Sequence, residues 1–129
     1  MIANLRTGIL LFAHGSPVEE ANQGVRDVAA KVAAAGPYAY VRAAFLEDAA
    51  PDLPAAVGEA AGAGIERLIV IPYFLTMGLH MRRDLPQLVA AARQQHPSLE
   101  IAVGESLEGH HLMPSIILGR VQEALEATR

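Results

Sequence analysis

Three side chains that can bind a metal ion or carry a proton recur at equal intervals along the chain: His14, Glu47 and His80. Two imidazoles and one carboxylate suit a divalent first-row ion such as Co²⁺, Ni²⁺, Fe²⁺ or Zn²⁺, and would leave coordination positions open for water or a substrate. A neutral histidine can instead accept a proton as a general base near pH 7. The structural alternative for each histidine is a hydrogen bond to a loop backbone, and for Glu47 a solvated surface carboxylate.

Each of the three residues follows a short apolar run that is typical of a buried strand. Strands are predicted at residues 8–13, 38–45, 67–72 and 100–103. The first ends at His14, the second leads to Glu47, and the third leads to the loop that carries His80. The first run, at residues 8–13, lacks polar alternation, as expected for a parallel strand that is covered on both faces.

Helical apolar patterns separate these strands. Ser16 and Asp52 are the expected N-caps of the first two helices. Helices are predicted at residues 17–35, 53–61, 84–95 and 114–127, where the third could begin at residue 81 and the fourth at residue 111. The last helix is expected to face the core with Leu112, Ile116, Ile117, Val121, Ala124 and Leu125.

The alternation of strand and helix predicts a three-layer α/β/α fold around a four-stranded parallel sheet, with right-handed crossovers. Residues 1–129 are expected to form a single domain. Ligands of such folds bind at the carboxyl ends of the strands. His14, Glu47 and His80 all follow those ends, so the sequence predicts that they converge at this edge.

The composition narrows the function further. A net charge of −4 argues against a nucleic-acid-binding protein, and the absence of cysteine excludes thiolate metal ligands. No apolar run approaches the roughly twenty residues that span a membrane. Residues 1–7 do not resemble a signal peptide, so a cytoplasmic protein is expected. Phosphate-loop and dinucleotide-binding motifs are also absent, which leaves nucleotide-driven chemistry without support.

Several residues near the three candidates have two readings. Ser16 could be a nucleophile, although Pro17 after it favours an N-cap. Arg82 could bind a substrate carboxylate or belong to a solvated first helical turn. The adjacent His110 and His111 could deliver metal or simply begin a helix. The loop after the third strand is unusually apolar and would suit a flat, apolar ligand, although some of its side chains must belong to the core or to a subunit contact.

Four segments together resemble the small CbiX-type class II chelatases, the relatives of sirohydrochlorin cobaltochelatase and ferrochelatase. The segments are Leu-Phe-Ala-His-Gly-Ser at residues 11–16, Phe-Leu-Glu at 45–47, Pro-Tyr-Phe-Leu-Thr-Met-Gly-Leu-His-Met-Arg-Arg-Asp-Leu-Pro at 72–86 and Leu-Glu-Gly-His-His-Leu at 107–112. The combined motif with its spacing is fairly specific, and it runs through nearly the whole chain.

The resemblance implies a chelatase-like half-domain that inserts a divalent metal into a tetrapyrrole without ATP. Co²⁺, Fe²⁺ or Ni²⁺ would be a substrate, and no prosthetic group is expected. His14 and His80 would take the family's metal-binding and catalytic positions, with Glu47 as their acidic partner. A homodimer is implied, because short members hold half of a two-lobed architecture. The candidates for substrate binding are Ser16, Phe74, Leu75, Thr76, Met77, Gly78 and Arg82. A carrier that binds metal or tetrapyrrole without turnover, and a purely structural α/β module, remain the alternatives.

Overall fold

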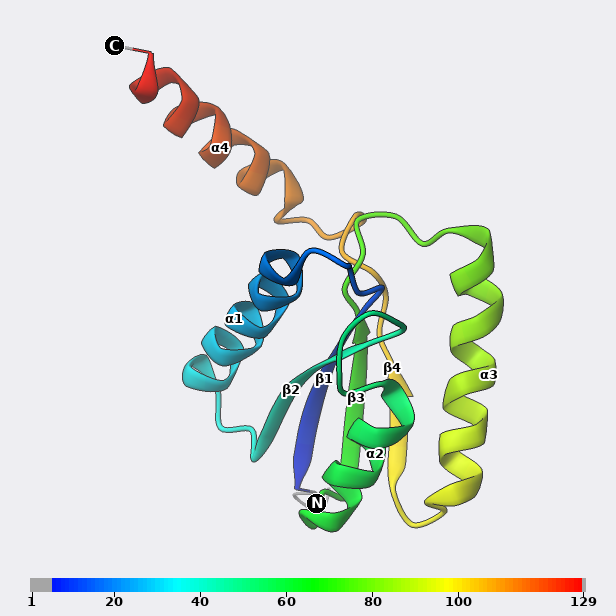
Figure 1. Ribbon diagram of the computed structural model, residues 1–129. Coiled ribbons are helices and arrows are strands. Elements are labelled where there is room, and N and C mark those ends of the chain that lie inside the picture. The colour runs from blue at the N-terminus through cyan, green and yellow to red at the C-terminus, as the bar shows by residue number, and fades with distance from the viewer. Residues whose placement is uncertain (1–5, 129) are drawn as a thin grey trace.

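The computed structural model describes residues 6–128, in which four strands alternate with four helices (Figure 1). From the sequence, residues 1–7 are not expected to form a signal peptide. Residues 1–5 of this segment lie outside the described part. In chain order the elements are β1 (Thr7–Ala13), α1 (Glu19–Ala35), β2 (Tyr40–Phe45), α2 (Leu53–Gly62), β3 (Arg67–Pro72), α3 (Leu79–Gln95), β4 (Glu100–Val103) and α4 (Met113–Ala127).

The strands form one parallel sheet in the order β2-β1-β3-β4. β1 and β3 are central and pair in register from Thr7 with Arg67 to Phe12 with Pro72. This confirms the predicted four-stranded parallel sheet, and the observed bounds of β3 and β4 are the predicted ones. All four strands therefore end at the same edge, here called the carboxyl edge.

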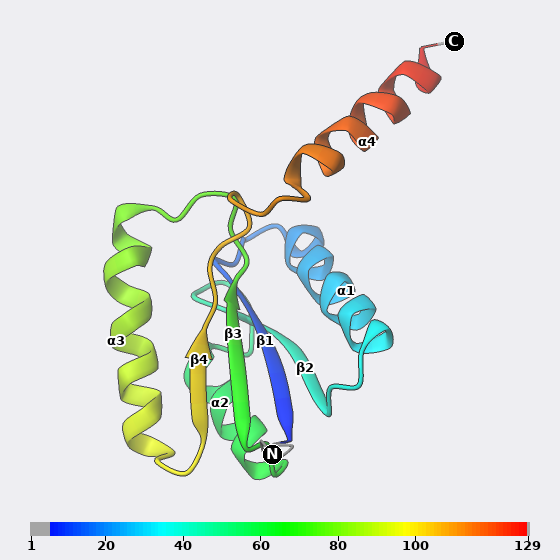
Figure 2. The same cartoon turned by 180° about the vertical axis from the view of Figure 1, so that it is seen from behind.

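The order of the strands decides which helix covers which face. Right-handed crossovers place α2 and α3, which lead toward β4, on one face, and α1, which leads toward β2, on the other (Figures 1 and 2). The face under α2 and α3 holds the larger core, which includes Leu10, Phe12 and Val70, each 0% exposed. A smaller core under α1 includes Leu11, Val25 and Phe45.

The last helix does not pack as the sequence predicts. None of the residues of α4 is buried, and the helix projects away from the sheet (Figures 1 and 2). The expectation that it faces the core is therefore wrong for a single chain. Its apolar side chains remain exposed because the β4–α4 segment leads the helix away from the sheet.

Two helix starts also differ from the prediction. Val18 is the N-cap residue of α1, and the Ser16 hydroxyl accepts a hydrogen bond from the Val18 amide, so Ser16 shapes the preceding turn rather than capping the helix. Helix α3 begins at Leu79, before the predicted start, which puts His80 in its first turn. The predicted cap at Asp52 is confirmed, since its carboxylate accepts from the Ala55 amide at 2.9 Å.

Within residues 6–128, no helix combines the length and the hydropathy that crossing a membrane requires.

Replacement of Leu10 by alanine tests the larger core. Leu10 lies on central strand β1 and is 0% exposed. Leu10→Ala is therefore expected to lower the free energy of unfolding by about 2–5 kcal/mol. Leu75 is 63% exposed and provides the matched control. Leu75→Ala should change stability by at most about 0.5 kcal/mol. Urea unfolding measures both, and equal effects would contradict this description of the core.

Candidate metal and substrate site

His14 and Glu47 meet at the carboxyl edge because the loops after β1 and β2 continue the pairing of those strands. The Leu46 amide donates to the Ala13 carbonyl at 2.9 Å, and the Glu47 amide donates to the His14 carbonyl at 3.1 Å. The two side chains then lie side by side, with His14 Nδ1 3.6 Å from Glu47 Oε1. The backbone thus places an imidazole and a carboxylate together before any ligand is bound.

The hydrogen bonds of His14 determine which ring nitrogen is free. Nδ1 lies 3.2 Å from the Gly15 carbonyl oxygen and faces the Glu47 carboxylate, and both groups are acceptors. The ring proton therefore belongs on Nδ1, which leaves the lone pair of Nε2 for a metal ion or for a proton. The two side chains are 59% and 58% exposed, so the pair is open to solvent in a single chain.

Gly15 permits this close approach, and its role was missed in the sequence. Its φ of +89° favours glycine, and a Cβ atom there would lie 1.7 Å from the Glu47 carbonyl oxygen. The signal available in the sequence was a glycine directly after a candidate ligand. In the loop after β2, Asp48 also has a positive φ, of 66°.

Asn22 ties the His14 loop to α1 and was also missed. It is 2% exposed, the one buried polar residue in the described part of the chain. Its Oδ1 accepts from the Ser16 amide at 2.9 Å, and its Nδ2 donates to the Ser16 carbonyl at 2.8 Å. These bonds occupy the Ser16 backbone, while the Ser16 hydroxyl bonds Val18, which gives Ser16 a structural role in the loop.

His80 lies at the same edge of the sheet but does not contact the pair. Its Nδ1 is 3.4 Å from Arg83 Nη2, and Arg83 in turn is paired with Asp84 at 3.1 Å. Among residues 6–128, no group of three or more histidine, aspartate or glutamate side chains is arranged to hold a metal ion. The structure therefore brings together two of the three predicted ligands within one chain, and leaves His80 apart.

The loop after β3 divides its side chains between core and solvent. Phe74 and Met77 pack against the larger core, whereas Leu75 is 63% exposed and Leu79 is 83% exposed. Thr76 is exposed as well, and Gly78 is the N-cap of α3. The exposed members of this loop are thus free to contact a ligand above the carboxyl edge.

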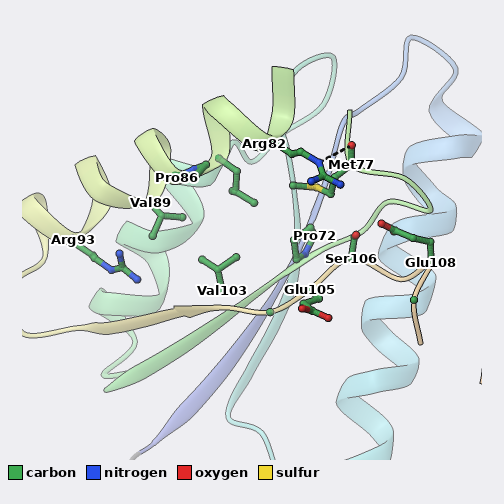
Figure 3. Close-up of a pocket in the computed structure, with 13 residues that line it drawn as sticks. Pro72, Met77, Arg82, Pro86, Val89, Arg93, Val103, Glu105, Ser106 and Glu108 are labelled. Carbon is green, nitrogen blue, oxygen red and sulfur yellow. Dashed lines mark hydrogen bonds between the residues drawn. The ribbon is translucent and has the colours of Figure 1, made fainter. Parts of the chain in front are cut away.

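A cavity of about 600 Å³ lies beside this loop, between α3 and the segment after β4 (Figure 3). Met77 and Arg82, two predicted substrate-binding residues, line it, and Arg82 Nε donates to the Met77 carbonyl at 3.3 Å. The segment after β4 contributes Ser106 and Glu108. A hydrogen bond from Ser106 lowers the pKa of Glu108, so this carboxylate is ionised at neutral pH.

The adjacent histidines before α4 support the start of that helix. Their rings stack with centroids 4.3 Å apart, and His110 Nδ1 accepts from the Leu112 amide at 3.1 Å. This contact favours the structural reading of His110 over metal delivery.

Comparison with known proteins identifies the family. Residues 8–124 match the sequence profile of the CbiX family. The chain belongs to the CbiX family. It is 29% identical over 127 residues to a sirohydrochlorin cobaltochelatase of Methanosarcina barkeri, and 25% identical over 128 residues to that of Methanococcoides burtonii. Each alignment covers 93% of this chain and 98% of the relative.

Solved structures of CbiX relatives share the fold. A protein of Marinobacter aquaeolei, described as a CbiX protein of cobalamin (vitamin B12) biosynthesis, superposes with a TM-score of 0.82 at 29% identity, covering 94% of this chain and 98% of that one. The sirohydrochlorin chelatase SirB of Bacillus subtilis, solved in complex with cobalt, gives 0.73 at 25% identity. The match covers 79% of this chain and only 44% of SirB, so SirB has a substantial further part.

Replacement of Gly15 tests the backbone contact that joins the two loops. Gly15→Ala combines a left-handed φ with a clash against the Glu47 carbonyl. A loss of stability of about 1–3 kcal/mol is therefore expected. Gly24, which lies on the exposed side of α1 with open space around it, is the matched control. Gly24→Ala should raise stability by about 0.5–1 kcal/mol. Urea unfolding measures both, and two changes of the same sign would contradict the contact.

Replacement of Asn22 tests the anchor of the His14 loop. Asn22→Ala leaves the Ser16 amide and carbonyl without partners and is expected to cost about 1–3 kcal/mol. Asn22→Asp keeps the acceptor and loses the donor, so its cost should also be substantial. Thermal unfolding measures stability, and the chemical shifts of the His14 ring report the loop. Unchanged stability in both variants would show that the anchor has no structural importance.

Proposed function

We propose that the protein is a class II chelatase that inserts cobalt or ferrous iron into sirohydrochlorin or a related tetrapyrrole without ATP, in cobalamin or siroheme biosynthesis. The single observation that carries the proposal is the His14–Glu47 pair, held ready at the carboxyl edge with His14 Nε2 unengaged. Membership of the CbiX family and the named activities of its relatives support the same reaction. Residues 1–129 act as one such domain.

The reaction requires two exchanges at the macrocycle. The metal ion must lose water ligands, and two pyrrole N–H groups of the ring must lose their protons as the metal–nitrogen bonds form. His14 Nε2 can accept one proton once the metal ion has left it for the ring, and the second proton passes to water. The resulting imidazolium is stabilised by the Glu47 carboxylate beside Nδ1. The metal contacts are His14, His80 and the Glu47 carboxylate, and imidazole and carboxylate ligands suit Co²⁺, Fe²⁺ and Ni²⁺.

The macrocycle would lie above the same edge. Its apolar faces match the exposed Leu75 on the loop after β3, with Thr76 and Gly78 next to it. Its carboxylate substituents match Arg82, which adjoins the cavity near Met77. Phe74 holds the loop after β3 in place through its contact with the core, and Ser16 holds the loop after β1 in place through its hydrogen bonds.

We also propose that the working unit is a homodimer. Within one chain the His14–Glu47 pair is more than half exposed, and His80 belongs to no metal-binding group among residues 6–128. A second copy that covers the carboxyl edge would exclude water and complete the ligand set. The further part of SirB, absent from the match to this chain, is consistent with a second half in the longer relative.

Replacement of the two histidines tests the proposal. His14→Ala removes the proton acceptor and His80→Ala removes a metal contact, so each should lower the rate of cobalt insertion into sirohydrochlorin by about 10²–10⁴-fold. Absorption spectroscopy of the ring measures the rate against a protein-free control. His96, at the opposite end of α3, is the matched control, and His96→Ala should insert metal at the wild-type rate.

Two results would contradict the proposal in different ways. Wild-type rates in both the His14 and His80 variants would place the chemistry elsewhere. A wild-type protein that shifts the absorption of a metallated ring but does not metallate the free ring would instead be a carrier.

A further inference from the structure

The first two turns of α1 carry a network of side chains that reaches the loop after β1. The buried amide of Asn22 donates from Nδ2 to the Ser16 carbonyl at 2.8 Å and to Glu19 Oε2 at 3.3 Å. Glu19 Oε1 in turn accepts a hydrogen bond from Arg26 Nη1. We call Glu19 and Arg26 together the α1 pair.

Glu19 determines which way the buried Asn22 amide points. An amide group has two N–H donors on its nitrogen and one carbonyl acceptor. Both donors of Asn22 are used, because the Ser16 carbonyl and the Glu19 carboxylate accept from the same nitrogen. A flipped amide would turn its oxygen toward these two acceptors. Without Glu19, one buried N–H group would lose its partner. Glu19 therefore fixes the orientation in which Asn22 bonds the Ser16 backbone.

Arg26 extends the network to the end of β2. Its guanidinium carbon lies 5.3 Å from the centre of the Phe45 ring, which is a cation–π distance. Phe45 is 0% exposed and lies two residues before Glu47. A Cβ atom at Gly15 would lie 3.4 Å from the Phe45 Cβ, so the same side chain also packs against the loop after β1. The α1 pair thus contacts that loop through Asn22 and the end of β2 through Phe45.

The charges of the α1 pair suit an orienting role. Glu19 lies in the first turn of α1, where the helix dipole favours a carboxylate. Hydrogen bonds from Arg26 and Asn22 lower the pKa of Glu19, so this carboxylate is ionised at neutral pH. The Glu19 side chain is 69% exposed, and an ion pair this open to solvent adds little to stability. What the pair contributes is the orientation of Asn22 and the cover over Phe45.

We propose that the two residues of the α1 pair are positioning residues of the metal site, which hold the loops of His14 and Glu47 in the relative position that metal insertion requires. The inference rests on the proposed function, which assigns the chemistry to His14 and Glu47. The α1 pair acts on them through Asn22 and Phe45 and takes no part in the chemistry itself.

The geometry that the α1 pair would maintain is sensitive to small movements. His14 Nδ1 and Glu47 Oε1 are 3.6 Å apart, which is longer than a normal hydrogen bond. Both side chains are more than half exposed, so the loops and not the surroundings hold them. A shift of about 1 Å in one loop would remove the carboxylate from the imidazole, and a misplacement of this size can lower a rate about 100-fold.

Glu19→Gln and Glu20→Gln are a matched pair of variants. Each removes one carboxylate from the first turn of α1, so each weakens the interaction with the helix dipole. Glu20 is exposed and makes no hydrogen bond or ion pair within residues 6–128. Glu19→Gln should lower kcat for cobalt insertion into sirohydrochlorin about 10-fold, whereas Glu20→Gln should keep the wild-type kcat. KM for sirohydrochlorin should be unchanged in both, because other loops hold the ring.

A double-variant cycle shows whether the two residues act as one unit. Arg26→Gln should lower kcat by the same factor as Glu19→Gln, and the double variant Glu19→Gln/Arg26→Gln should lower it no further. Arg26→Lys keeps the charge but not the planar group over Phe45, so its kcat should lie between those of Arg26→Gln and the wild type. Circular dichroism confirms that each variant is folded. Additive losses in the double variant would contradict a single unit.

The ring nitrogens of His14 provide a readout that does not depend on metal insertion. Nitrogen NMR of histidine-labelled protein reports the surroundings of Nδ1, which lies beside the Gly15 carbonyl and the Glu47 carboxylate. Glu19→Gln should shift the His14 signals, and Glu20→Gln should leave them in place. The signals of His96, at the opposite end of α3 from His80, should stay the same in every variant.

The two readouts separate this inference from the proposed function. Equal kcat in the Glu19 and Glu20 variants, or a raised KM at unchanged kcat, would overturn the positioning role while insertion by the wild type retains the function. A wild type that does not metallate sirohydrochlorin would contradict the function. The His14 signals then decide the positioning role, which stands if Glu19→Gln alone shifts them and falls if it does not.

Discussion

The candidate site depends on how closely two loops approach each other above β1 and β2. The pairing of these strands continues for two hydrogen bonds beyond their ends, and only a glycine at position 15 leaves room for the Glu47 carbonyl. This approach sets the position of His14 and Glu47 relative to each other without any contribution from a ligand. A solvent-exposed ion pair contributes little to stability on its own, so the backbone, and not the attraction between the side chains, maintains this geometry.

The third strand contributes to the same edge in a different way. Its loop uses Phe74 and Met77 to fill the core and leaves Leu75 in solvent, so one short segment both secures itself and presents an apolar surface. The loop ends where α3 begins, at Leu79. His80 therefore lies in the first turn of this helix. A candidate ligand on a helix start, away from the other two, suits a site that closes when substrate or a second copy arrives.

The uneven cover of the sheet follows from the order of its strands. Two of the three crossovers that join strands lead toward β4 and occupy one face, and only α1 occupies the other. A sheet of four strands is too wide for one helix, so part of that face requires a further helix. Ile69 and Ile71 of the central strand β3 are only half-buried on that face, since α4 projects away from the sheet.

The sequence by itself determined the alternation of strands and helices, because apolar runs and helical periodicity are local properties of Arg67–Pro72 and of each helix. It also placed His14, Glu47 and His80 after strand ends. Only the tertiary structure decided that Gly15 and Asn22 hold the first two loops in place while His80 stands apart, since those contacts join different loops and elements. The apolar pattern of α4 likewise predicted burial but could not say against which sheet, because periodicity records a buried side and not its partner.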